Sequence, residues 1–173
     1  TLMYRDGRDV ALSMQAFKPI RPAIWSWKWN RRFGANPIDI NNPAGRSLRL
    51  YRADEALGFK PLIRWMVNHA PPLKDCAGFW SELTLTSLPA FRALPAERRH
   101  WIDYDRLTRE PKSILADLAR FLGVEPDRDW LENACAIPKA SEARWKTLEA
   151  GAQADLNAWT SKAREAAAQM SGQ

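Results

Sequence analysis

The spacing of apolar residues predicts a strand followed by a helix at the start of the chain. The short apolar run within Thr1–Arg5 is typical of a buried strand. Over residues 8–17, Val10, Met14 and Phe17 stand at i, i+4 and i+7, the spacing of one buried helical face. We therefore expect a strand that leads directly into an amphipathic helix, with these three side chains facing the core.

Proline, glycine and apolar periodicity divide the rest of the chain. Four prolines, two glycines and an Asn-Asn pair predict a long irregular connection over residues 18–50. Pro111 is placed to open a helix and Gly123 to end it. The apolar stripe of that helix is Ile114, Leu115, Leu118, Phe121 and Leu122. The other predicted elements are helices over 51–70 and 73–93, a strand over 100–104 and a last helix in about the final thirty residues.

Strands that alternate with helices favour an α/β fold, here rich in helix, with a parallel sheet flanked by helices. With 173 residues, of which 46% are hydrophobic, the chain can bury one sizeable core, so we expect a single domain over 1–173. Ligands of parallel sheets bind beyond the carboxyl ends of the strands. Arg5 and residues 103–105 follow the two predicted strands, so these strand ends predict a shared site.

Charge and cysteine content narrow the class of protein. A net charge of +6 and a pI near 9.6 favour an anionic partner. Cys76 and Cys135 show neither metal-ligand spacing nor the density of a disulfide scaffold, so we expect two free thiols in a reducing compartment. No apolar run is long enough to cross a bilayer and no signal peptide is visible. We therefore expect a soluble, cytoplasmic protein.

The segment "YRDGRDVALSM", residues 4–14, places four charged residues at the predicted junction between strand and helix. Asp6 is suited to cap the helix, with Asp9 as the acidic member of a capping box. Capping does not account for Arg5. The stretch "YRDGRDVALS" resembles the segment of the sulfotransferase family written R-x-P-x-D-V-x-x-S, and the spacing of eight between Arg5 and Ser13 matches it.

A second block carries the same resemblance. "WIDYDRLTREPKSILADLARFLGV" is similar to the family's later strand, Y-E-D-L, proline and helix ending F-L-G, and it follows the first block at about ninety residues. Three features depart from the family pattern. Gly7 stands where the family often has Pro, "EARWK" at residues 142–146 is only a loose counterpart of the carboxyl-terminal R-K-G motif, and the P-K-S-G-T-T-W turn has no counterpart.

The resemblance implies roles for individual residues. Arg5 and Ser13 would hold the 3′-phosphate of the sulfate donor PAPS (3′-phosphoadenosine 5′-phosphosulfate), through a planar fork of donors and a hydroxyl. Tyr104 would lie beside the adenine, and Asp105 either caps a turn or touches ligand. The P-loop-like turn and the catalytic base would precede Thr1. The chain is thus predicted to be the carboxyl-terminal, 3′-phosphate-binding portion of a sulfotransferase, with a partial P-loop-like sheet, inactive without its amino-terminal half.

The implied reaction transfers a sulfuryl group from PAPS to a hydroxyl or amine of a small-molecule or glycan acceptor, and needs no metal. We therefore expect no nucleic-acid partner and no membrane partner, and a homodimer is compatible with this reaction. Two alternatives remain. A P-loop phosphotransferase would need an upstream G-x-x-x-x-G-K-[ST] segment and an Mg²⁺-binding Asp, and a non-catalytic basic module would bind polyanions with steep salt dependence.

The remaining aromatic and histidine residues favour structural roles. Trp25, Trp27 and Trp29 could line an acceptor pocket, but tryptophans beside a loop more often pack in the protein. The two histidines, His69 and His100, do not stand where the resemblance places a catalytic base. We therefore expect both histidines to be structural.

Overall fold

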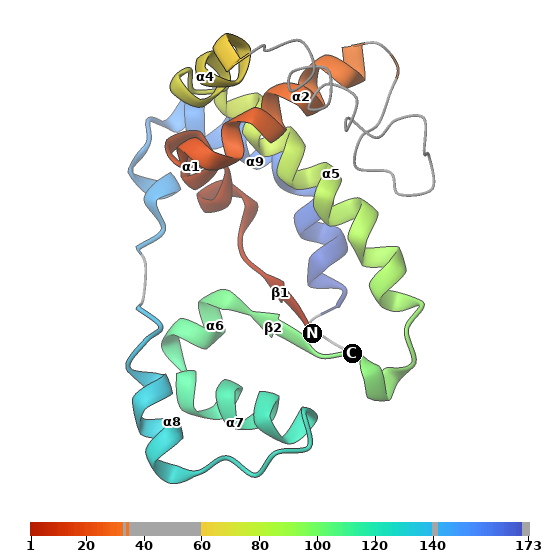
Figure 1. Cartoon of the computed structure of the whole chain (residues 1–173), viewed down its shortest axis with the longest axis vertical. Coiled ribbons are helices and arrows are strands. Elements are labelled where there is room, and N and C mark those ends of the chain that lie inside the picture. The colour runs from red at the N-terminus through yellow and green to blue at the C-terminus, as the bar shows by residue number, and fades with distance from the viewer. Residues whose placement is uncertain (33, 35–59, 140–141, 171–173) are drawn as a thin grey trace.

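Within the part of the chain that the structure describes, the sheet consists of two short parallel strands. The computed structural model describes residues 1–32, 34, 60–139 and 142–170 (Figure 1). β1 (Leu2–Tyr4) pairs in parallel with β2 (Trp101–Asp103), and the register sets Tyr4 opposite Asp103. The predicted helix-rich α/β fold with a parallel sheet is therefore confirmed.

Helices make up most of the described chain. The α-helices are α1 (Gly7–Ala16), α2 (Arg21–Arg32), α4 (Lys60–Asn68), α5 (Leu73–Arg92), α6 (Tyr104–Arg109), α7 (Pro111–Phe121), α8 (Arg128–Cys135) and α9 (Ala150–Ala168). The described residues also form the short 3-10 helices η1 (Lys18–Ile20), η3 (Ala96–Arg98) and η4 (Arg144–Thr147). In Figure 1 the long helices α5 and α9 pack together, while α6, α7 and α8 gather at the opposite end of the molecule from α2 and α4. None of the helices described is both long and apolar enough to span a bilayer.

Side chains that alternate along the strands pack in opposite directions. Leu2, Tyr4 and Trp101 contact a cluster from α5 and the end of α9, which consists of Leu88, Phe91, Ala167 and Met170. Ile102 belongs instead to a cluster with Leu107 and Ile114 from α6 and α7. The main core joins α1, α2, α5 and α9 through Ala11, Ile24, Trp27, Cys76, Ala77, Phe79 and Leu156. One face of the sheet therefore packs on α5 and the end of α9, and the other packs on α6 and α7. The carboxyl end of the sheet lies where α1 and α6 begin.

The buried face of α1 differs from the predicted stripe. Gly7 and Ala11 are buried, and Phe17, which follows the last residue of α1, is 61% exposed. Val10 and Met14 are half-buried, and Met14 packs against the main core as predicted. A Cβ placed on Gly7 would lie 2.6 Å from Cδ2 of Trp80 and closer still to two other ring atoms. The small residues of α1 thus form its contact face, because they let the helix approach α5 closely.

The irregular connection predicted over residues 18–50 is wrong in its first part, where η1 and α2 are helical. Pro19 and Pro22 occupy first turns, where the missing N–H breaks no helical hydrogen bond. Residues 35–59, which include the start of the helix predicted over 51–70, lie outside the described residues. The strand predicted over 100–104 ends at Asp103, whose side chain caps α6, and α8 was not predicted.

Candidate functional site

Arg8 and Asp6 fix the start of α1. The Asp6 carboxylate caps the helix by accepting a 2.9 Å hydrogen bond from the Arg8 amide, as predicted, and it also forms an ion pair with the Arg8 side chain. Burial alone would raise the pKa of Asp6, but its hydrogen bonds with Arg8 outweigh burial and lower that pKa below its ordinary value. Arg8 also donates to Asn157 Oδ1 at 2.8 Å and lies 3.7 Å above the Trp145 ring. These contacts tie α1 to η4 and α9.

Arg5 and Tyr104 come together at the carboxyl ends of the two strands. Because Tyr4 is opposite Asp103 in the parallel register, the next residues of both chain segments leave the sheet side by side. The guanidinium carbon of Arg5 lies 4.7 Å from the centroid of the Tyr104 ring, within cation–π range. The structure thus supports the expectation that the two strand ends share one place, where a cation and an aromatic ring are in contact.

Ser13 lies on α1 and contacts a residue that sequence reasoning did not select. Arg144 of η4 donates a 2.8 Å hydrogen bond from Nη2 to Ser13 Oγ. The Trp145 amide donates to the Asp9 carboxylate at 3.1 Å, so the capping-box role expected for Asp9 is wrong and this carboxylate holds η4 on α1 instead. Arg144 belongs to the "EARWK" segment, whose loose likeness to a basic family motif was the one available signal for it.

Carboxylates also surround the strand ends. Asp103 accepts hydrogen bonds from the amides of Asp105 and Arg106 at 2.8 and 3.0 Å, and so caps α6. Burial, and then the negative charges of Asp103 and Asp6, raise the pKa of Asp105, while Arg5 acts in the opposite direction. Asp105 therefore lies in a negative field close to Arg5 and weakens the attraction of this place for an anion.

Asp105→Asn is expected to strengthen anion binding at the strand ends by roughly two- to fivefold at neutral pH, because it removes a repulsive charge near Arg5. It should also change the pH dependence of stability. A raised pKa in the folded state means that the protonated acid contributes stability below its ordinary pKa, and that this contribution is lost as pH rises through the raised value. Asp105→Asn should remove that loss.

The measurements are calorimetric titration with inorganic phosphate and denaturant unfolding at a series of acid to neutral pH values. Asp155→Asn, on the exposed surface of α9, makes the same charge change and serves as the control. An identical pH dependence of unfolding for wild type and Asp105→Asn would contradict the raised pKa.

The other residues considered in the sequence lie elsewhere. Trp27 is in the main core, whereas Trp25 and Trp29 form an aromatic cluster with Trp65 of α4, and His69 stacks on Trp65 at 4.6 Å between centroids. His100 stacks on Phe121 at 4.8 Å, and burial lowers its pKa. Both cysteines are free thiols. Within the described ranges, no three His, Cys, Asp or Glu side chains are grouped as a metal site requires.

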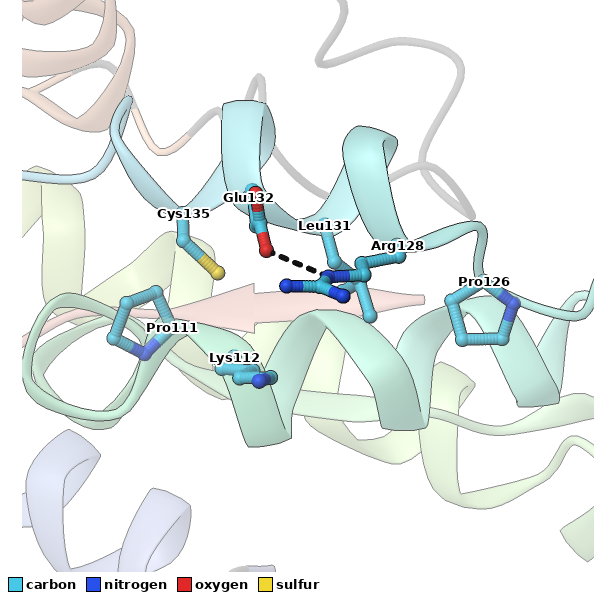
Figure 2. Close-up of a pocket in the computed structure, with 7 residues that line it drawn as sticks. All are labelled: Pro111, Lys112, Pro126, Arg128, Leu131, Glu132 and Cys135. Atoms are coloured by element: carbon cyan, nitrogen blue, oxygen red, sulfur yellow. Dashed lines mark hydrogen bonds and ion pairs between the residues drawn. The ribbon is translucent and has the colours of Figure 1, made fainter.

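A cavity of about 430 Å³ opens between the start of α7 and α8 (Figure 2). Its lining residues are Pro111, Lys112, Pro126, Arg128, Leu131, Glu132 and Cys135. Arg128 and Glu132 pair with each other at 3.0 Å along α8, which leaves Lys112 as the remaining charged side chain in the lining. Arg5, Ser13 and Tyr104 are absent from its lining, so this cavity is separate from the strand-end site.

The structure thus brings the candidate residues together in two pairs, Arg5 with Tyr104 at the strand ends and Ser13 of α1 with Arg144 of η4. Two guanidinium groups, a hydroxyl and an aromatic ring are suited to a phosphate-bearing ligand with a planar base. Comparisons with protein-family models, with curated proteins and with solved structures found no match for this chain.

Proposed function

We propose that this chain is the 3′-phosphate-binding part of a PAPS-dependent sulfotransferase. The observation that carries the proposal is the 2.8 Å hydrogen bond from Arg144 to the Ser13 hydroxyl. Ser13 is one of the two side chains to which the resemblance assigns the 3′-phosphate, and the bond places a guanidinium group beside it. The contact between Arg5 and Tyr104 at the adjacent strand ends gives further support.

The chemistry of these groups fits a phosphate dianion. Because the Ser13 oxygen accepts from Arg144, its own O–H can donate to a phosphate oxygen. Arg144 and Arg5 supply planar forks of donors, which form charge-assisted hydrogen bonds stronger than neutral ones. In the proposal Tyr104 stacks on adenine, with its ring oriented by the Arg5 guanidinium on one face.

In the proposed reaction an acceptor hydroxyl or amine attacks the sulfur of PAPS in line, a base takes its proton, and adenosine 3′,5′-bisphosphate leaves. Arg5, Ser13 and Arg144 contribute by holding the donor in position. Neither the base nor the cradle for the 5′-phosphosulfate is assigned to a residue described here. The base and the cradle would both come from a companion segment, the amino-terminal half of the same fold.

The sheet offers a place for such a segment. Met3 is 55% exposed, whereas Ile102, opposite it in the register, is only 2% exposed. Parallel sheets are normally covered on both faces and contain more than two strands. A further strand beside β1 would bring its own helix, which would cover Met3. The turn between that strand and its helix would be the cradle for the 5′-phosphosulfate.

The proposed site should give this chain a tighter affinity for adenosine 3′,5′-bisphosphate than for adenosine 5′-monophosphate. Charge-assisted hydrogen bonds are worth about 1.5 to 3 kcal/mol, so we expect a preference of roughly ten- to a hundredfold. Arg5→Ala and Arg144→Ala should each remove most of this preference. Ser13→Ala should remove a smaller share, because a neutral hydroxyl contributes about 0.5 to 1.5 kcal/mol.

The experiment is titration calorimetry with both nucleotides at two salt concentrations. Arg120→Ala, an exposed arginine of α7 paired with Asp117, is the matched control and should leave the preference unchanged. Equal affinities of the wild type for both nucleotides would exclude the 3′-phosphate site. A loss of binding with salt that is the same for both nucleotides would indicate the polyanion-binding module, and Mg²⁺-dependent binding of ATP would indicate the phosphotransferase.

A further inference from the structure

An apolar groove lies between the end of α7 and the start of α8. It has a volume of about 440 Å³, and its apolar walls include Leu118, Leu122, Val124, Pro126 and Trp130, with Glu125 at the rim. Leu122, Val124 and Trp130 are 62%, 58% and 45% exposed. The sequence pattern placed Leu122 on the buried stripe of α7, but this side chain lines the groove instead. We call this surface the α7–α8 groove.

The α7–α8 groove is acidic on a chain that is basic overall. Its lining residues include two acidic side chains, Glu125 and Asp127, and no basic one, whereas the whole chain carries a net charge of +6. Of these, Glu125 lies at the rim and is exposed, and Asp127 caps α8. An exposed apolar surface with one sign of charge at its edge is typical of an interaction site. Its charge favours a basic partner that presents an apolar side chain.

The chain itself presents such a surface on α4. Pro61, Arg64, Trp65 and Asn68 stand at i, i+3, i+4 and i+7 and are all exposed, so they form the outward stripe of this helix. We call them the α4 patch. Trp65 is 39% exposed, yet its ring is braced by His69 at 4.6 Å and by Trp25 at 5.1 Å. The α4 patch therefore holds a tryptophan beside an arginine in a fixed orientation, and these residue types dominate interface energetics.

We propose that the α4 patch of one copy docks into the α7–α8 groove of a second copy. Trp65 would insert between Leu122 and Trp130, and Arg64 would meet Glu125 at the rim. The two surfaces are opposite in charge, both expose large apolar side chains that the fold leaves uncovered, and both belong to the same chain. A basic chain is attracted to an acidic groove, which favours a second copy as the occupant.

The position of the two surfaces determines the kind of assembly. In Figure 1, α4 lies at one end of the molecule and α7 and α8 lie at the other. One copy therefore uses different surfaces at its two ends, which is a heterologous, head-to-tail contact. This inference does not depend on the sulfotransferase proposal.

Charge reversal at the two exposed rim residues tests the pairing. In sedimentation velocity, the average sedimentation coefficient of the wild type should rise with protein concentration and fall with added salt. Arg64→Glu and Glu125→Arg should each weaken association by roughly tenfold or more, because each places like charges opposite one another. An equimolar mixture of the two variants, and the double variant on one chain, should recover most of the association, because every contact again joins opposite charges.

Leu122→Ser tests the apolar part of the same contact and should also weaken association, with little effect on folding at a residue that is 62% exposed. Arg98→Glu, exposed in η3, makes the same charge change as Arg64→Glu away from both surfaces and should have no effect. A wild type that stays monomeric at every concentration would overturn the proposal. So would two single variants that associate like wild type, or a mixture that stays as weak as its components.

Discussion

Replacing Arg21 with alanine is expected to lower the free energy of unfolding by about 3 to 5 kcal/mol. Arg21 is only 8% exposed and donates to three backbone carbonyls: Gln15 at 3.0 Å, Ala16 at 3.2 Å and Val67 at 3.0 Å. It thereby satisfies carbonyls at the ends of α1 and α4 that have no partner within their own helices. Removing the guanidinium would leave these carbonyls without a donor in a buried place, so α1, α2 and α4 should separate more easily.

Denaturant unfolding followed by tryptophan fluorescence measures this loss. Arg21→Lys should be destabilised by roughly half as much, because an ammonium group cannot reach three carbonyls with the planar geometry of a guanidinium. Arg32→Ala, at the exposed end of the same helix, is the control and should be nearly neutral. A loss for Arg21→Ala below about 1 kcal/mol would mean that water satisfies these carbonyls equally well.

Gly7→Ala is expected to lower the free energy of unfolding by about 3 kcal/mol, although alanine is intrinsically the better helix former by about 1 kcal/mol. The reason is steric. The added Cβ would lie 2.6 Å from Cδ2 of Trp80, whose side chain is buried in the core. Either α1 or the indole must shift, and a shift of α1 would also displace Ser13.

Gly151→Ala is the matched control for this prediction. Gly151 lies in the first turn of α9, and no neighbouring atom lies within 4 Å of the position that a Cβ would take, so alanine there should be neutral or slightly stabilising. The two variants are compared by denaturant unfolding and by their affinity for adenosine 3′,5′-bisphosphate. If Gly7→Ala were as stable as Gly151→Ala, the prediction that Trp80 leaves no space for a Cβ at position 7 would be wrong.

Local signals along the chain were sufficient for several elements, because the groups that interact are a few residues apart. Asp6 caps α1 through the amide of Arg8, two residues on. Pro111 opens α7, and Gly123, with φ of 73°, adopts the left-handed conformation that ends a helix. The alternation of strands and helices also predicted the parallel pairing that brings Arg5 to Tyr104.

Packing between distant elements set what local signals could not. Hydrophobic spacing selected Phe17 for the buried face of α1, but α1 ends at Ala16 and Phe17 is exposed, while Gly7 packs against Trp80. The close approach of α1 to Trp80 is not visible in the spacing of apolar residues along the chain.

The candidate site shows the same division. Arg5, Ser13 and Tyr104 could be selected as candidates without a structure, because their spacing within two short blocks is visible along the chain. The folded chain was needed to join Ser13 to Arg144, 131 residues away, and Asp9 to Trp145. Such pairings depend on how α1 and η4 pack on the common core, and residue type and local spacing carry little information about contacts at that separation.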